Sequence, residues 1–355
     1  MTSPARSERA RVTVLRKKFP RTSRRSAALA GGMRSVAKPA LNAWSYAPGL
    51  SRLSRVMDRT ADRLALPNGT TVDTVQLGPC DAEWVRAPRA RDDGAVLYLH
   101  GGAFIVCSLA SHRRLVAATS RTCRVPVLNV NFRMLPEVTI EGMVGDCLAG
   151  YQWLLDQGYA ADRISIVGDS AGGYLAFAVA LALRDEQLPM PASITGMSPL
   201  LDLDVKRKEA SPHREKCDLF TVRACRALQQ LVSHVDDAHE AEGDRICPID
   251  ADLRGLPPVL IQMGSREILR PDAEVMADRL AAAGVPTQLQ IWTGQVHVFQ
   301  AAASWVPEAA AAMREVGRFV RGNLPAVHSA GNYSNGSTRT VRDAAARAAS
   351  SSSAG

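Results

Sequence analysis

Between residues 95 and 322, short apolar runs alternate with longer segments of helical periodicity, and this alternation restricts the possible folds more than any other feature. Continuous apolar runs of four to six residues are typical of strands buried on both faces, as in a parallel sheet covered by helices. The chain is therefore predicted to have an α/β fold with a mostly parallel central sheet. The predicted strands cover residues 95–99, 125–130, 164–168, 194–197, 258–263 and 288–292, and the predicted helices cover residues 141–157, 171–186, 272–283 and 307–322.

Composition divides the 355 residues into a core and less regular parts. Residues 1–30 are rich in Ser and Arg and are predicted to form a disordered basic tail. Residues 31–69 have helix-like apolar spacing, and residues 70–325 carry the alternating pattern. Within the latter, residues 203–247 are polar and helix-like, as expected of an insertion that forms a cap. Residues 326–355 are rich in Ala and Ser and are predicted to be disordered.

The net charge of +8 is concentrated at the N-terminus, because nine Lys and Arg residues lie within the first 25 residues and only Glu8 opposes them. A nucleic-acid partner is therefore not expected, although such a tail could make peripheral contact with an anionic membrane. The seven cysteines are widely spaced and form no C-x-x-C motif, which favours a reducing, cytoplasmic location over the membrane periphery or cell envelope. No metal site or cofactor is expected.

The segment Gly168-Asp-Ser-Ala-Gly172 matches the motif G-x-S-x-G in its expected structural context. A predicted strand leads directly into the motif and a predicted helix leaves it, which is the arrangement of a nucleophile elbow. The glycines permit the tight turn that exposes the hydroxyl of the central serine. Ser170 is therefore the candidate nucleophile.

A second glycine-rich loop, His100-Gly-Gly-Ala-Phe104, follows the predicted strand 95–99. A serine hydrolase stabilises the oxyanion of its tetrahedral intermediate with backbone N–H groups. The N–H groups of Gly101 and Gly102, together with that of Ala171, are the predicted donors. His100 is interpreted as a structural residue of this loop.

The general base and its acid are predicted from their positions after the last two strands. His297 lies in the loop after strand 288–292, where this architecture places the base. Glu267 is the first acidic residue after strand 258–263. Asp272 is the alternative, but it stands where a helix N-cap is expected.

Several motifs in one order resemble those of the hormone-sensitive-lipase family of bacterial esterases. These are His100-Gly-Gly-Ala-Phe104, Asn131-Phe-Arg-Met-Leu-Pro-Glu137, Gly168-Asp-Ser-Ala-Gly-Gly173, Ser198-Pro-Leu-Leu-Asp-Leu203, Leu253-Arg-Gly-Leu-Pro-Pro258 and Gly294-Gln-Val-His-Val-Phe299. The resemblance covers residues 70–325 and implies an α/β-hydrolase fold and a metal-independent esterase or lipase. It also implies a cap built from residues 31–69 and 203–247, and it supports Glu267 as the acid.

The sequence departs from the family pattern at two positions, where Ala103 replaces a glycine and Leu135 replaces an alanine. Both positions bear on the size of the acyl site. The expected function is hydrolysis of short- to medium-chain acyl esters through an acyl-enzyme on Ser170. A non-catalytic small-molecule receptor on the same scaffold and a serine peptidase or amidase are the alternatives. The sequence leaves the natural substrate and the oligomeric state open.

Overall fold

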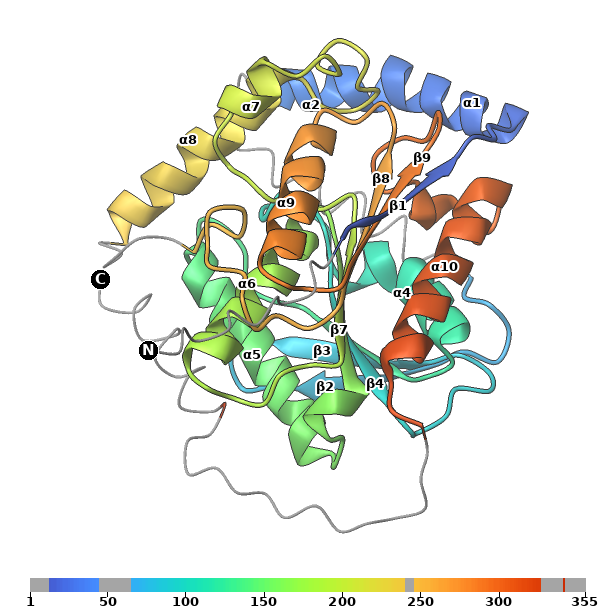
Figure 1. The fold of residues 1–355 in the computed structure, drawn as a ribbon, viewed down its shortest axis with the longest axis vertical. Coiled ribbons are helices and arrows are strands. Elements are labelled where there is room, and N and C mark those ends of the chain that lie inside the picture. The colour runs from blue at the N-terminus through green and yellow to red at the C-terminus, as the bar shows by residue number, and fades with distance from the viewer. Residues whose placement is uncertain (1–12, 45–64, 240–245, 327–340, 342–355) are drawn as a thin grey trace, which may run out of the picture.

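The computed structural model of the protein describes residues 13–44, 65–239, 246–326 and residue 341. At its centre lies a nine-stranded sheet with the strand order β1-β9-β8-β7-β6-β4-β5-β3-β2 (Figure 1). All neighbouring strands are parallel except the pairs β2–β3 and β3–β5. The strands are β1 (Leu15–Phe19), β2 (Thr71–Gln76), β3 (Asp81–Arg86), β4 (Ala95–Leu99), β5 (Val127–Val130), β6 (Ile164–Asp169), β7 (Ser193–Met197), β8 (Val259–Gly264) and β9 (Thr287–Trp292). The predicted mostly parallel α/β fold is confirmed.

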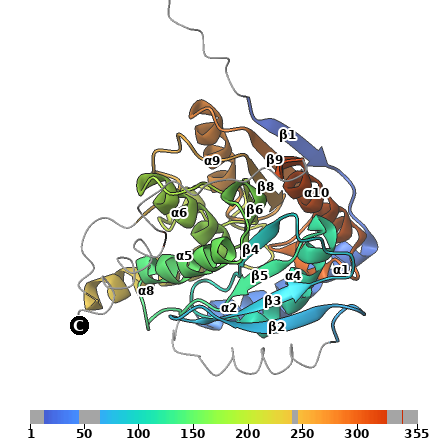
Figure 2. The same cartoon turned by 90° about the horizontal axis from the view of Figure 1, so that it is seen from below.

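Helices cover both faces of the sheet, which explains why its central strands are apolar on both sides. Helices α5, α6 and α9 lie on one face, and α4 and α10 lie together on the other (Figures 1 and 2). Each face encloses its own apolar cluster, one containing Leu97 and Ile166 and the other containing Val96 and Val167. The helices are α1 (Arg24–Gly32), α2 (Lys38–Trp44), α4 (Leu109–Cys123), α5 (Ile140–Asp156), α6 (Ala171–Asp185), α7 (Lys206–Glu209), α8 (Val222–Ala238), α9 (Arg270–Ala282) and α10 (Pro307–Asn323).

The prediction that residues 1–30 are disordered is wrong for residues 13–30. Residues Leu15–Phe19 form the edge strand β1, and α1 follows after an N-cap at Ser23, whose side chain accepts a hydrogen bond from the N–H of Ser26 at 3.2 Å. The strand is basic because an edge strand is paired and covered on fewer sides than a central strand and tolerates Lys and Arg. Arg16 forms an ion pair with Asp278 at 2.5 Å.

Part of the predicted basic tail therefore has partners inside the fold. Lys17 lies 3.9 Å from a carboxylate oxygen of Glu315, and Arg25 donates to the carbonyl of Trp305 at 3.0 Å. The predicted peripheral contact of the basic N-terminus, residues 1–30, with an anionic membrane stays a prediction, and residues 1–12 of this segment lie outside the described residues. The predicted disordered tail, residues 326–355, also lies outside them apart from Ala326 and Val341.

Phe19 anchors β1 by stacking on Trp292 of β9, with ring centroids 3.7 Å apart and an interplanar angle of 1°. A Phe19→Ala variant is expected to lower the free energy of unfolding by about 1–2 kcal/mol, less than for a fully buried ring because Phe19 is half-buried. Urea unfolding followed by circular dichroism measures this change. The matched control is Leu15→Ala in the same strand. Because Leu15 is 49% exposed, this substitution should lower the free energy of unfolding by under about 0.5 kcal/mol. An equal decrease in the free energy of unfolding in both variants would contradict the anchoring role of Phe19.

Helices from two distant parts of the chain lie above the carboxyl ends of the parallel strands (Figure 1). The first part runs from α1 through a π-helical turn at Met33–Ala37 into α2, within the range predicted as cap helices. The second part, α7 and α8, belongs to the predicted insertion 203–247 between β7 and β8. Helices α2 and α8 pack against each other. No helix in the described ranges is long and apolar enough to cross a bilayer.

Candidate active site

Ser170 lies at the sharp turn between β6 and α6, with φ 52° and ψ −119°. This conformation is strained for a residue with a side chain, and such strain concentrates at functional sites. The turn depends on two glycines, Gly168 and Gly172, which lie on either side of Ser170. A Cβ on Gly168 would lie 2.1 Å from the carbonyl oxygen of Gly172, and one on Gly172 would lie 1.9 Å from that of Leu99. The sequence therefore folds this segment so that the Ser170 hydroxyl stands above the carboxyl edge of the sheet.

Three predicted site residues meet in one chain of hydrogen bonds. His297 Nε2 lies 2.8 Å from Ser170 Oγ, and His297 Nδ1 lies 2.7 Å from Glu267 Oε2. A carboxylate only accepts hydrogen bonds, so Nδ1–H donates to Glu267 and Nε2 accepts from the serine hydroxyl. All three residues are less than 9% exposed. The ring of Phe220 packs edge-on against the imidazole of His297, with ring centroids 4.7 Å apart. This arrangement is able to remove the serine proton.

Glu267 is held by groups that the sequence reasoning did not identify. Its Oε1 accepts from Ser198 Oγ at 2.7 Å and from the N–H of Gly264 at 2.5 Å. Ser198 Oγ also accepts from the N–H of Val298 at 3.1 Å, so it links the loops that carry Glu267 and His297. Ser198 lies directly after β7 with φ 49°. Its position at the carboxyl end of a predicted strand was the available signal.

Asp272, the alternative acid, lies away from His297 and is bound elsewhere. Its carboxylate forms ion pairs with Arg207 Nε at 2.9 Å and with Lys208 Nζ at 2.8 Å. Burial raises the pKa of Asp272 despite these two cations. The expectation that Asp272 caps a helix is also wrong, because α9 begins at Arg270 and Asp272 lies inside its first turn. Asp272 therefore joins α9 to the insertion rather than to His297.

The glycine-rich loop after β4 lies directly beside Ser170. A Cβ on Gly101 would lie 2.3 Å from Asp169 Oδ2 and 3.0 Å from the Ser170 Cβ, so no side chain fits there. Gly102 has φ 127°, a conformation that favours glycine. The N–H groups of Gly101, Gly102 and Ala171 donate to no acceptor within the described ranges, and Ala171 is the first residue of α6. These free donors suit the stabilisation of a negative oxygen.

Polar groups behind this loop hold its shape. Asp169 accepts from Tyr98 Oη at 2.7 Å and lies 3.3 Å from His112 Nε2. Burial opposes ionisation of Asp169, but His112 and Tyr98 outweigh it, and the pKa of Asp169 lies below its ordinary value. His100 is fully buried with Nδ1 2.7 Å from the carbonyl oxygen of Gly101, and burial lowers its pKa to about 4. His100 is therefore neutral at physiological pH and contacts the loop, not Ser170.

A small, mostly apolar cavity of about 40 Å³ opens at Ser170. It reaches under the helices α2 and α8 and includes Ala103, one of the two departures from the family pattern. Leu135, the other departure, is buried but is not part of the cavity wall. The lining residues are Leu41, Trp44, Ala103, Ser170, Leu200, Asp202, Leu203, Lys208, Phe220, Ala224, Cys225, Leu228 and Leu269.

The sheet order and the serine at the β6–α6 turn define the class of protein. A family model of the alpha/beta hydrolase fold matches residues 96–301, and the chain belongs to this family. It resembles in particular the bacterial hormone-sensitive-lipase esterases.

Curated relatives carry esterase names. Esterase LipU of Mycobacterium tuberculosis is 41% identical over 292 residues, which cover 80% of this chain and 98% of that protein. Carboxylesterase/phospholipase LipF of the same organism is 38% identical over 336 residues, covering 91% of this chain and 88% of LipF. The acetyl-hydrolase of Streptomyces hygroscopicus is 36% identical over 259 residues, covering 73% and 84%.

Solved structures agree with these relatives. The crystal structure of EstE5 soaked with ethyl alcohol has a TM-score of 0.76 at 32% identity, covering 85% of this chain and 99% of EstE5. An esterase of the bacterial hormone-sensitive lipase family has a TM-score of 0.76 at 29% identity, covering 86% and 100%. The protein is an ester-hydrolysing enzyme of the α/β-hydrolase family.

Proposed function

We propose that this esterase works by serine acyl transfer, with Ser170 as nucleophile, His297 as general base and Glu267 as the acid that orients the histidine. The observation that carries the proposal is the continuous pair of hydrogen bonds, 2.7 Å and 2.8 Å, from Glu267 through His297 to Ser170. A carboxylate in this position keeps the imidazole in the tautomer that accepts the serine proton.

In the first step, His297 removes the proton of Ser170, and Oγ bonds to the ester carbonyl carbon. The N–H groups of Gly101, Gly102 and Ala171 bind the resulting oxyanion. His297 returns the proton to the leaving alcohol as the carbon–oxygen bond breaks. Water, deprotonated by His297, then cleaves the acyl-enzyme, releases the acid and restores the serine.

The direct test of this mechanism is covalent trapping. The full chain is incubated with a fluorophosphonate, and peptide mass spectrometry locates the adduct. The expected result is one phosphonylated residue, Ser170, and loss of labelling after heat denaturation, because only the folded site activates the hydroxyl. An unlabelled protein that still hydrolyses esters, or an adduct confined to another residue, would exclude the acyl-enzyme on Ser170.

The cavity at Ser170 favours short acyl chains. Its volume of about 40 Å³ lies far below the ~300–1,000 Å³ usual for small-molecule sites, so a long acyl chain does not fit without rearrangement. The name of the Streptomyces hygroscopicus relative, acetyl-hydrolase, supports the same substrate class. We expect kcat/KM for p-nitrophenyl acetate or butyrate to exceed that for the palmitate by at least about 100-fold, because four or more buried CH₂ groups would have no space. A chain-length series from acetate to palmitate measures this preference.

A variant of the cavity wall extends this test. Leu228→Ala removes a lining side chain contributed by α8, and the preferred acyl chain should lengthen by two or more carbons. The matched control is Val232→Ala, one turn further along α8, because Val232 is buried but does not line the cavity. An unchanged preferred acyl chain length in both variants, or an equal change of that length in both, would show that the acyl group lies elsewhere. The result also tests whether α2 and α8 act as a cap over the acyl site.

A further inference from the structure

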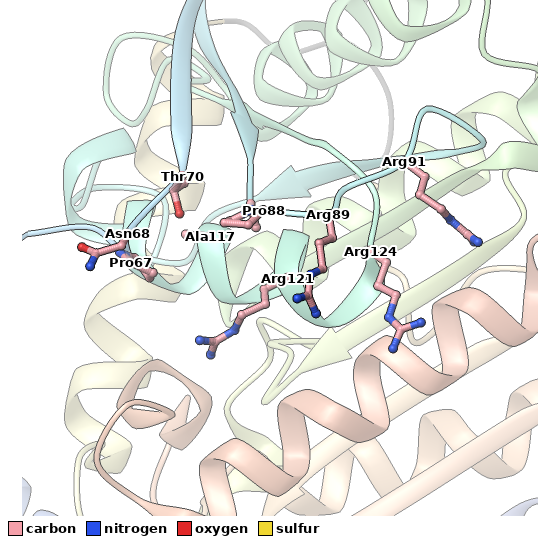
Figure 3. A pocket seen from close by; sticks show the side chains of 10 residues that line it. Pro67, Asn68, Thr70, Pro88, Arg89, Arg91, Ala117, Arg121 and Arg124 are labelled. Carbon is pink, nitrogen blue, oxygen red and sulfur yellow. The ribbon is translucent and has the colours of Figure 1, made fainter.

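A second cavity, of about 790 Å³, is lined by the residues drawn as sticks in Figure 3. Besides residues 67–70, which precede β2, it is formed by two segments, the connection between β3 and β4 and the second half of α4 with the following Arg124. Both segments lead into the amino ends of β4 and β5, whereas Ser170 lies at the carboxyl end of β6. The cavity is therefore separated from the ester-hydrolysing site by the length of the sheet. Its wall consists of Pro67, Asn68, Thr70, Ala87, Pro88, Arg89, Arg91, Ala117, Arg121 and Arg124.

Arginines gather at this cavity from separate segments. Figure 3 shows the side chains of Arg89, Arg121 and Arg124 extending to the same side of α4, with Arg91 further along the loop. A neighbouring cavity of about 280 Å³ shares Arg121 and Arg124 and is completed by arginines of α10. Together the two cavities include seven arginines, namely Arg89, Arg91, Arg121, Arg124, Arg314, Arg318 and Arg321.

Few carboxylates balance this charge. Arg91 pairs with Asp93 at 2.9 Å, and Arg318 pairs with Glu315. In the described part of the chain, no side-chain ion pair is formed by Arg89, Arg121, Arg124 or Arg314.

Arg321, the least exposed of the seven arginines, is affected by the positive charge of its neighbours. Burial lowers the pKa of Arg321, and the guanidinium groups of Arg124, Arg318 and Arg91 lower it further. Mutual repulsion of this kind is relieved when an anion enters the cluster.

The helix dipole explains the presence of only some of these arginines. Basic residues near a helix C-terminus stabilise its partial negative charge, which accounts for Arg121 in the last turn of α4 and for Arg321, which donates to the carbonyl of Thr122. It does not account for Arg89 and Arg91, which lie in a loop. Arg89 and Arg124 have φ values of 68° and 61°, in the left-handed region where glycine is the usual residue. Arginine occupies both positions although the backbone conformation favours glycine.

The remaining wall of the cavity consists of prolines, alanines, Asn68 and Thr70. Thr70 Oγ1 is buried and has no hydrogen-bond partner among the residues that the structure describes. This oxygen is enclosed by protein atoms, so Thr70 lines the cavity with its other atoms. The apolar floor, which includes Pro88 and Ala117, suits the organic part of a ligand.

We propose that this cavity binds a small organic molecule carrying two or more phosphate charges, at a site separate from ester hydrolysis. The phosphates contact Arg89, Arg121 and Arg124, since guanidinium groups match phosphate oxygens in bidentate geometry. The organic part lies on Pro88 and Ala117. The cavity volume falls within the ~300–1,000 Å³ usual for small-molecule sites.

The test uses inorganic tripolyphosphate as the probe and isothermal titration calorimetry of the full chain at 150 mM salt (about physiological). We expect saturable binding of one tripolyphosphate per chain. Arg121→Gln should weaken it about tenfold, the usual order for one charge-assisted contact. The matched control is Arg114→Gln, which removes the same charge from an exposed position of the same helix outside both cavities and should leave binding unchanged. Ser170→Ala should bind as the unmodified chain does.

Three outcomes would overturn the proposal. The first is the absence of saturable binding, and the second is equal weakening by Arg121→Gln and Arg114→Gln, which would indicate only a general charge effect. The third concerns the source of the phosphate. Sedimentation with phosphatidic acid vesicles that depends on Arg121, without any binding of tripolyphosphate, would assign the arginines to a lipid surface.

Discussion

Replacing Ser170 with alanine is expected to reduce kcat for p-nitrophenyl acetate by about 10⁴–10⁶-fold, because the attacking oxygen is removed while the free N–H groups and the cavity remain. The residual rate comes from the oxyanion donors and from substrate binding alone. Ser170 is a turn residue whose hydroxyl, among the described residues, bonds to His297 alone, so the fold should be retained. Steady-state kinetics and a thermal melt of the same preparation measure both quantities.

The matched control is Ser165→Ala in β6, the strand that leads to Ser170. Ser165 is fully buried, and its hydroxyl lies 2.9 Å from that of Ser193, so the substitution removes a serine of similar burial away from His297. It should lower stability by about 1 kcal/mol and leave kcat within about threefold. Turnover by Ser170→Ala that matches the unmodified enzyme would refute the assigned nucleophile.

Replacing Glu267 with glutamine is expected to lower kcat by about 10³–10⁴-fold with a smaller change in KM. The amide keeps the shape of the side chain but removes the negative charge next to His297 Nδ1. The imidazole then loses its preference for the tautomer that accepts the serine proton. The imidazolium formed during reaction also loses its counter-charge. Kinetics at several pH values separate these effects from a change in substrate binding.

Asp272→Asn is the comparison that decides between the two candidate acids. Asp272 pairs with Lys208 and Arg207, so its loss should cost about 3–5 kcal/mol of folding stability as a broken buried ion pair. At a temperature where the variant is folded, kcat should remain within about tenfold, because no contact links Asp272 to His297. A larger loss of kcat in Asp272→Asn than in Glu267→Gln would reverse the assignment of the acid.

The sequence by itself determined the features that depend on local order along the chain. Apolar runs alternating with helices predicted the parallel sheet, because burial on both faces requires continuous apolar strands. Strand ends predicted the candidate site residues, since the carboxyl ends of parallel strands meet at one edge of a sheet. Ser170, Glu267 and His297 all follow strands, and the structure brings them within hydrogen-bond distance.

Tertiary structure decided the features that depend on partners far away in the chain. The strand β1 was missed because Leu-Arg-Lys-Lys-Phe has no apolar periodicity, and its stability comes from pairing with β9 and from the stack of Phe19 on Trp292. Ser198 and Asp272 differ in role because of what they contact, Glu267 in one case and Lys208 in the other. The arginine cavity joins residues up to 57 positions apart, Pro67 and Arg124, which no local pattern relates. Hydrogen bonds, ion pairs and cavities join side chains across the fold, so only the packed chain reveals them.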